Sequence, residues 1–104
     1  MPRSGARKTR ELGMIYFNNM HDLVAAQDIV KIATQMAKKN KLKSISKIVV
    51  RLGKIEAHGE EIQPENLRFN FELVKRNTFA EKALLLIQKG RGEELSIVEV
   101  QGER

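Results

Sequence analysis

The sequence of 104 residues contains no cysteine. This absence excludes disulfides, thiolate catalysis and cysteine-based zinc sites built from this chain. The soft or borderline metal ligands that remain are two histidines, His21 and His58, and four methionines. No apolar run approaches the ~20 residues that span a bilayer, and the basic start lacks the apolar core of a signal peptide. We therefore expect a cytoplasmic protein without a membrane partner.

Catalytic signatures are also missing. No nucleophile–base pair or acid–base dyad stands out, and the glycine-rich stretch KGRG precedes a strand pattern rather than the helix of a phosphate-binding loop. Aromatic residues make up only 5% of the chain, and Phe69, Phe71 and Phe79 are expected in the core. Few aromatic side chains are therefore left to form a surface on which nucleic-acid bases could stack. The sequence indicates that the protein is not an enzyme.

Half of the net charge of +6 lies in residues 1–19. That segment has little apolar surface to offset the entropy of ordering, so we expect residues 1–13 to be disordered. Residues 14–17 can pack on the domain or pair weakly. The expected division is a basic, disordered N-terminal extension over 1–19 and one folded domain over 20–104.

Within the folded domain, apolar periodicity predicts two helices and three strands. The helices are expected at 22–40 and 64–76, and the strands at 47–52, 83–88 and 94–100. A right-handed crossover makes the first two strands parallel, and the glycines of KGRGE favour a hairpin between the last two. The predicted class is α/β, in a two-layer α+β arrangement: a small mixed three-stranded sheet with two helices packed on it, in the order α-β-α-β-β.

Two histidines lie beside carboxylates and are candidate metal ligands. His21 precedes Asp22 at the expected start of a helix, and His58 lies in a loop near Glu56, Glu60 and Glu61. A neutral imidazole binds nickel, copper or zinc. The alternative is structural: Asp22 caps the helix through its carboxylate while His21 is merely exposed. For His58 the alternative is an ordinary polar loop.

Three stretches taken together resemble a known family. They are MHDLVAAQDIVKIATQMAKKNKLKSISKIVVRLGKI, PENLRFNFELVKRNTFAEKALLLI and GEELSIVEVQGE, over about residues 20–102. They resemble the HypA-type nickel-incorporation proteins of hydrogenase maturation. The resemblance implies a metallochaperone that binds nickel transiently at its Met-His-Glu start and passes it on, with a GTPase partner, to hydrogenase or urease.

Carried onto this chain, the nickel triplet falls on Met20, His21 and Asp22, with His58 as a candidate extra ligand. Ni(II) favours square-planar nitrogen ligands, and a terminal amine, two backbone amides and the His21 imidazole supply four. Here aspartate replaces the usual glutamate, and nineteen residues precede Met20. Two interpretations stay open: a natural start at Met20, which restores the amine, or a true extension with altered metal binding.

The family also carries a zinc domain with paired Cys-x-x-Cys motifs between its last two strands. In this chain KGRGE joins the two strand patterns directly, so no zinc is expected. Our predicted function is a nickel-binding accessory protein for maturation of a nickel enzyme, with that enzyme's large subunit and a GTPase as partners. The alternative is a metal-independent interaction or nucleic-acid-binding module that uses its basic extension.

Overall fold

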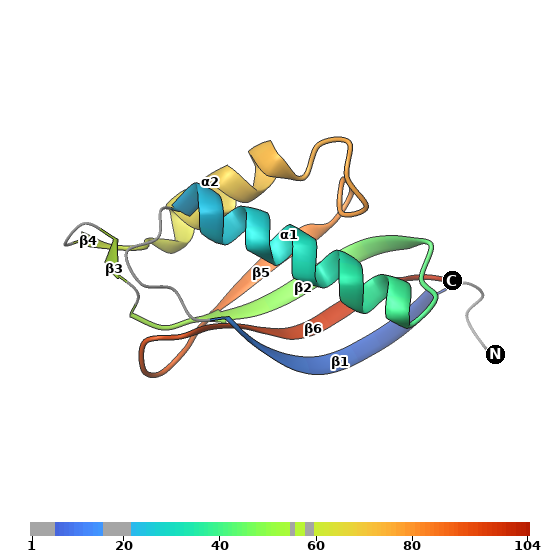
Figure 1. Ribbon diagram of the computed structural model, residues 1–104, viewed down its shortest axis with the longest axis horizontal. Helices are drawn as coiled ribbons and strands as arrows, with labels where there is room; N and C mark the ends of the chain where they lie inside the picture. Colours follow the sequence, from blue (N-terminus) through green and yellow to red (C-terminus); the bar gives the residue numbers. More distant parts are fainter. Residues whose placement is uncertain (1–5, 16–21, 55, 58–59) are drawn as a thin grey trace.

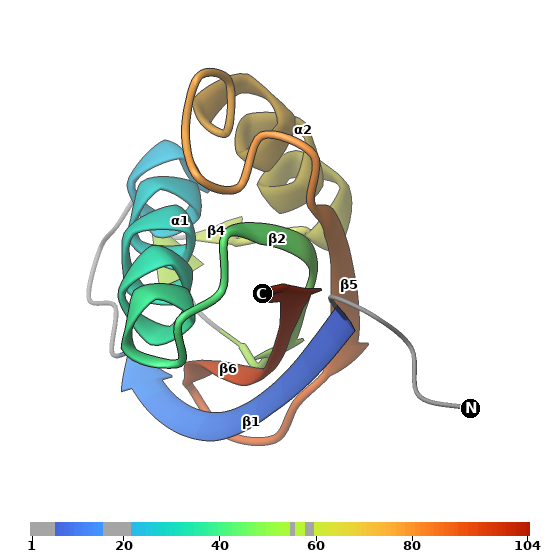
Figure 2. The ribbon, with the colours of Figure 1, turned by 90° about the vertical axis from the view of Figure 1, so that its right-hand side faces the viewer.

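A computed structural model describes residues 6–15, 22–54, 56–57 and 60–104. Two helices, α1 (Asp22–Lys39) and α2 (Pro64–Val74), lie side by side against one face of a sheet (Figures 1 and 2). The sheet contains four strands, which are β1 (Ala6–Ile15), β2 (Ser44–Leu52), β5 (Leu84–Lys89) and β6 (Leu95–Glu103). The short strands β3 (Glu56–Ala57) and β4 (Glu60–Glu61) pair only with each other. The predicted two-layer α+β class and mixed sheet are confirmed.

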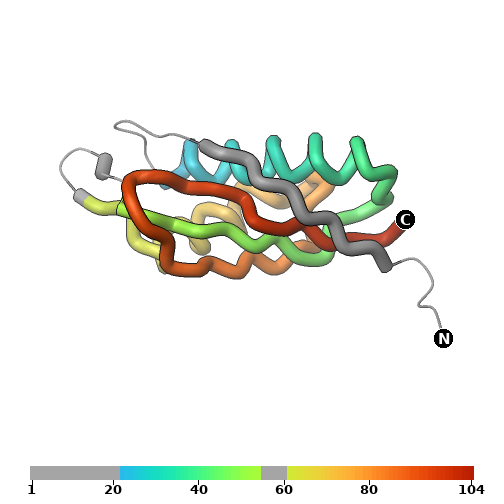
Figure 3. The backbone as a smooth tube through the Cα atoms, turned by 90° about the horizontal axis from the view of Figure 1, so that it is seen from below, coloured from blue at the N-terminus to red at the C-terminus, as the bar shows by residue number. Residues whose placement is uncertain are grey.

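The strand order is β1-β6-β2-β5, with β2 parallel to β5 and antiparallel to β6. The parallel pair was predicted, but the predicted hairpin between 83–88 and 94–100 is wrong. β2 lies between these two strands, so the chain from β5 to β6 passes across the end of β2 (Figure 3). β2 is therefore hydrogen-bonded to a strand on each side. Its alternate side chains Ile48, Val50 and Leu52 are buried.

The expectation that residues 1–13 are disordered is wrong for residues 6–13. They belong to β1, which runs antiparallel to β6 from Ala6 opposite Glu103 to Ile15 opposite Leu95. The sheet therefore has four strands instead of three. Backbone hydrogen bonds form whatever the side chains are, so the nine-residue β6 can order a polar segment that has no apolar pattern of its own.

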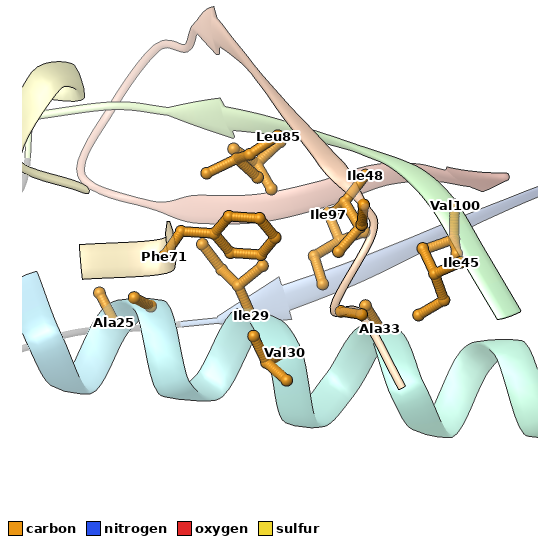
Figure 4. Packing of buried hydrophobic residues seen from close by; sticks show 14 of the residues in the cluster. Ala25, Ile29, Val30, Ala33, Ile45, Ile48, Phe71, Leu85, Ile97 and Val100 are labelled. Atoms are coloured by element: carbon orange, nitrogen blue, oxygen red, sulfur yellow. The ribbon is translucent and has the colours of Figure 1, made fainter. Parts of the chain in front are cut away.

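The core lies between the helices and the sheet (Figure 4). Ile29 of α1, Phe71 of α2 and Ile97 of β6 are each fully buried there. Phe71 was expected in the core, and Phe79 packs against it partly buried. The expectation for Phe69 is wrong, because its side chain is 65% exposed. Phe69 lies about 200° around the helix from Leu67, so it points away from the sheet.

Neither helix could cross a membrane: among the described residues, none combines sufficient length with sufficient apolar character.

Candidate metal centre

The predicted metal triplet ends where α1 begins. Asp22 is the first residue of α1 and its side chain is half-buried. Met20 and His21 lie outside the described residues. A carboxylate in the first turn interacts favourably with the positive end of the helix dipole. The helix runs to Lys39, against a predicted end at residue 40, so the sequence located this element closely.

The first turns of α1, which follow the predicted triplet in the sequence, contain buried residues. Ala25 and Ala26 have no exposed surface, and neither does Ile29 one turn later. In Figure 4 Ile29 lies beside the Phe71 ring of α2. The small alanines let the two helices approach closely, so the start of α1 is held against α2 rather than projecting into solvent.

Several chain segments meet at the end of the molecule where α1 starts. The first turn of α2, the β3–β4 pair and the connection from β5 to β6 also lie at this end (Figure 1). A cavity of 780 Å³ lies between the ends of β2 and β5 and the start of α2. Its lining includes the cations Lys54, Lys89 and Arg91 together with the acids Glu61 and Glu93. This cavity was not predicted, because its residues come from three separate segments of the sequence.

The second predicted ligand, His58, lies outside the described residues. Its flanking strands are described: Glu56 is the register partner of Glu61, and Ala57 is the partner of Glu60. Among the residues that the structure describes, no group of three or more His, Cys, Asp or Glu side chains is close enough to hold a metal ion.

The chain matches the protein family described as hydrogenase/urease nickel incorporation, metallochaperone, hypA, over residues 20–100. Among curated proteins, it is 34% identical over 84 residues to the hydrogenase maturation factor HypA of Legionella pneumophila strain Lens. That match covers 81% of this chain and 62% of the relative. A HypA of Caldanaerobacter subterraneus is 31% identical over 74 residues, covering 71% of this chain and 61% of the relative.

The chain thus spans less than two thirds of the length of these relatives. Among solved structures, it is similar in fold to the solution structure of the nickel metallochaperone HypA from Helicobacter pylori, with a TM-score of 0.59 and 22% identity. That similarity covers 68% of this chain and 58% of the other. The family match starts at Met20, two residues before α1 begins.

Proposed function

Because the chain belongs to the HypA family of hydrogenase and urease nickel-incorporation metallochaperones, we propose that it binds Ni(II) at the start of α1 for delivery to a nickel enzyme. The family is one of metallochaperones, not of enzymes. One observation carries this proposal. The family match begins at Met20, and α1, whose first residue is the Asp22 of the proposed triplet, begins two residues later.

The proposed ligands are Met20, His21 and Asp22, with His21 as the principal one. An imidazole nitrogen suits Ni(II), and neighbouring backbone nitrogens complete a square-planar set when they lose their protons. In the 104-residue chain the Met20 nitrogen is an amide, which is a poorer donor than an amine. The Asp22 carboxylate and the His58 imidazole are the proposed substitutes. His58 lies in sequence between β3 and β4, which occupy the same end of the molecule as the first turn of α1 (Figure 1).

Nickel is the cargo in this proposal, not a resident cofactor. The proposed receiver is the large subunit of a nickel enzyme of the hydrogenase type, and the proposed helper is a GTPase of the maturation machinery. We place this exchange in the cytoplasm. A site at the start of a helix, with few ligands, suits transfer because its ligands can be replaced one at a time.

The proposal is tested by titrating the 104-residue chain with Ni(II) at pH 7.5, by calorimetry and by absorption spectroscopy. We expect binding of one Ni(II) per chain, its loss in His21→Ala, and a smaller loss in His58→Ala. Circular dichroism of both variants checks that each is folded. Equal binding by the wild type and His21→Ala would overturn the proposed site, and no binding by any of the three would overturn the proposed function.

The role of the amine can be measured with a chain that begins at Met20. We expect this chain to bind Ni(II) more tightly than the 104-residue chain, with the yellow, diamagnetic signature of square-planar nitrogen coordination. It lacks β1, so its folding is checked first by circular dichroism. The matched control is the same shortened chain carrying His21→Ala, which should not show this signature.

A further inference from the structure

The two edges of the main sheet differ in chemistry. β1 forms one edge and β5 the other. β1 has the features that protect natural edges from pairing: its sequence, ARKTRELGMI, carries four charges, and its register shifts between Arg10 and Gly13. β5 has only one such feature, the charge of Lys89 at its last residue. Its sequence, LLLIQK, has no proline and no charge before Lys89, and its register with β2 is unbroken.

The backbone of β5 is set up to pair on its outer side. The Gly90 N–H donates to the Leu52 carbonyl, 2.9 Å away, and alternate residues of a parallel strand direct both backbone groups to the same neighbour. The backbone N–H and C=O groups of Leu84, Leu86 and Gln88 therefore point toward β2. Leu85 and Ile87 direct their N–H and C=O groups to the outer edge, where no hydrogen bond to another part of the described chain is recorded.

The exposed side chains of β5 are apolar. Leu84 is 67% exposed and Leu86 is 47% exposed, on the sheet face that the helices do not cover. Val49 of β2, in register with Leu86, lies beside it and is buried. A regular edge strand with exposed leucines and no charge over four residues is a template for another strand.

We propose that β5 pairs antiparallel with β5 of a second copy of this chain, about a two-fold axis at Leu86. This register is self-complementary. Leu85 of each copy lies opposite Ile87 of the other, so the outward groups of both residues form four N–H···O=C bonds. The two Leu86 residues lie opposite each other. Leu84 of each copy lies diagonally across from Leu86 of the other copy, within reach of contact.

Charge is compatible with this pairing. Lys89 of one copy falls opposite Ala83 of the other, whose carbonyl accepts a hydrogen bond from Lys75 Nζ at 3.0 Å, and Glu72, 2.9 Å from the same Nζ, offsets the charge of Lys75. The result is a closed dimer with one continuous eight-stranded sheet, in which the protected β1 strands form both outer edges. Each copy carries a net charge of +6, so salt should strengthen the dimer by screening the repulsion between the copies.

The pairing is tested by cross-linking, because the chain contains no cysteine of its own. In this register the two Leu86 Cα atoms would lie ~4.5 Å apart, as in other non-hydrogen-bonded antiparallel pairs. That separation suits a disulfide, for which Cα atoms lie about 4.4–6.8 Å apart. We expect Leu86→Cys to form a disulfide dimer under mild oxidation. Leu73→Cys on α2 is the matched control, since Leu73 is similarly exposed at 44%, and it should stay largely monomeric.

Association is measured separately by sedimentation of the 104-residue chain in metal-free buffer, so the result does not depend on nickel binding. We expect a concentration-dependent dimer, with a Kd at least about tenfold higher in Leu86→Lys and unchanged in Leu73→Lys. A chain that stays monomeric, or a Leu86→Lys variant that dimerises as the wild type does, would overturn the proposal. Efficient cross-linking through Leu73→Cys but not Leu86→Cys would also overturn it.

Discussion

The carbonyl oxygen of Gly92 lies 2.5 Å from the position that a Cβ atom on Gly53 would take. The Lys54 N–H donates to this oxygen at 2.8 Å, and the Gly53 N–H donates to the Glu94 carbonyl at 2.8 Å. The connection from β5 to β6 is thus tied across the end of β2. Gly53 allows the close approach because it has no side chain.

Gly53→Ala should destabilise the fold. Three backbone carbonyl oxygens surround the added carbon, the nearest of them that of Gly92, so the connection has to move. We expect a loss of about 1–3 kcal/mol in the free energy of unfolding, as for other overpacked sites. Urea denaturation measures it. Lys54→Ala is the control, because Lys54 is exposed and its replacement should change stability by less than ~0.5 kcal/mol.

Removal of residues 1–15 should destabilise the protein, because β6 would lose one of its two partner strands. Each lost backbone hydrogen bond contributes about 0.5–1.5 kcal/mol, so we expect a total loss above ~2 kcal/mol. Urea denaturation and faster hydrogen exchange of the β6 amides would measure it. A variant with Arg7, Lys8 and Arg10 changed to Gln controls for the lost charge. Unchanged stability of the shortened chain would contradict the pairing of β1.

Phe69 and Phe71 lie two residues apart on α2 and should respond very differently to truncation. Phe71 has no exposed surface, so Phe71→Ala should lose about 3–5 kcal/mol of unfolding free energy through lost burial and a cavity. Phe69 is 65% exposed, so Phe69→Ala should change stability by less than ~0.5 kcal/mol. Thermal or urea unfolding compares the two variants directly, and equal losses would contradict the orientation of α2.

Some elements of this fold follow from the local sequence, and others depend on distant segments. The apolar period of α1 fixed its ends within one residue, because packing of Ala25, Ala26 and Ile29 follows that period. The strand that pairs with β6 could not be predicted from the local sequence. Two glycines in KGRGE suit a hairpin, but pairing with β2 gives β6 a longer ladder, from Ser44 opposite Glu103 to Leu52 opposite Leu95.

β1 was missed for a related reason. Its charged sequence has no strand alternation, and its order depends on the edge that β6 offers. At the candidate site, the sequence located the start of the helix at Asp22 but not the nearby cavity, whose basic residues Lys54, Lys89 and Arg91 converge only after folding. The assignment of Met20, His21 and Asp22 as nickel ligands stays a prediction.

Nickel affinity should depend on pH in one direction. A histidine binds metal only as the neutral imidazole, so protons compete with Ni(II) below the ordinary His pKa of ~6.5. We expect the apparent affinity to fall as pH decreases from 7.5 to 5.5, by roughly tenfold for each pH unit below ~6 from the imidazole alone, and more steeply because each backbone amide that binds must also lose a proton. Calorimetry in buffers of matched ionic strength measures this fall. An affinity that is constant over this range would contradict a histidine ligand.

The most direct test of the proposed site is X-ray absorption at the nickel edge for the one-to-one complex of Ni(II) with the 104-residue chain. Ordered imidazoles give a characteristic multiple-scattering pattern, so the spectrum reports how many histidines bind the metal. We predict imidazole scattering that His21→Ala abolishes or sharply reduces, while His58→Ala retains the His21 contribution. An unchanged spectrum in His21→Ala, or a wild-type spectrum without imidazole scattering, would contradict nickel binding at the start of α1.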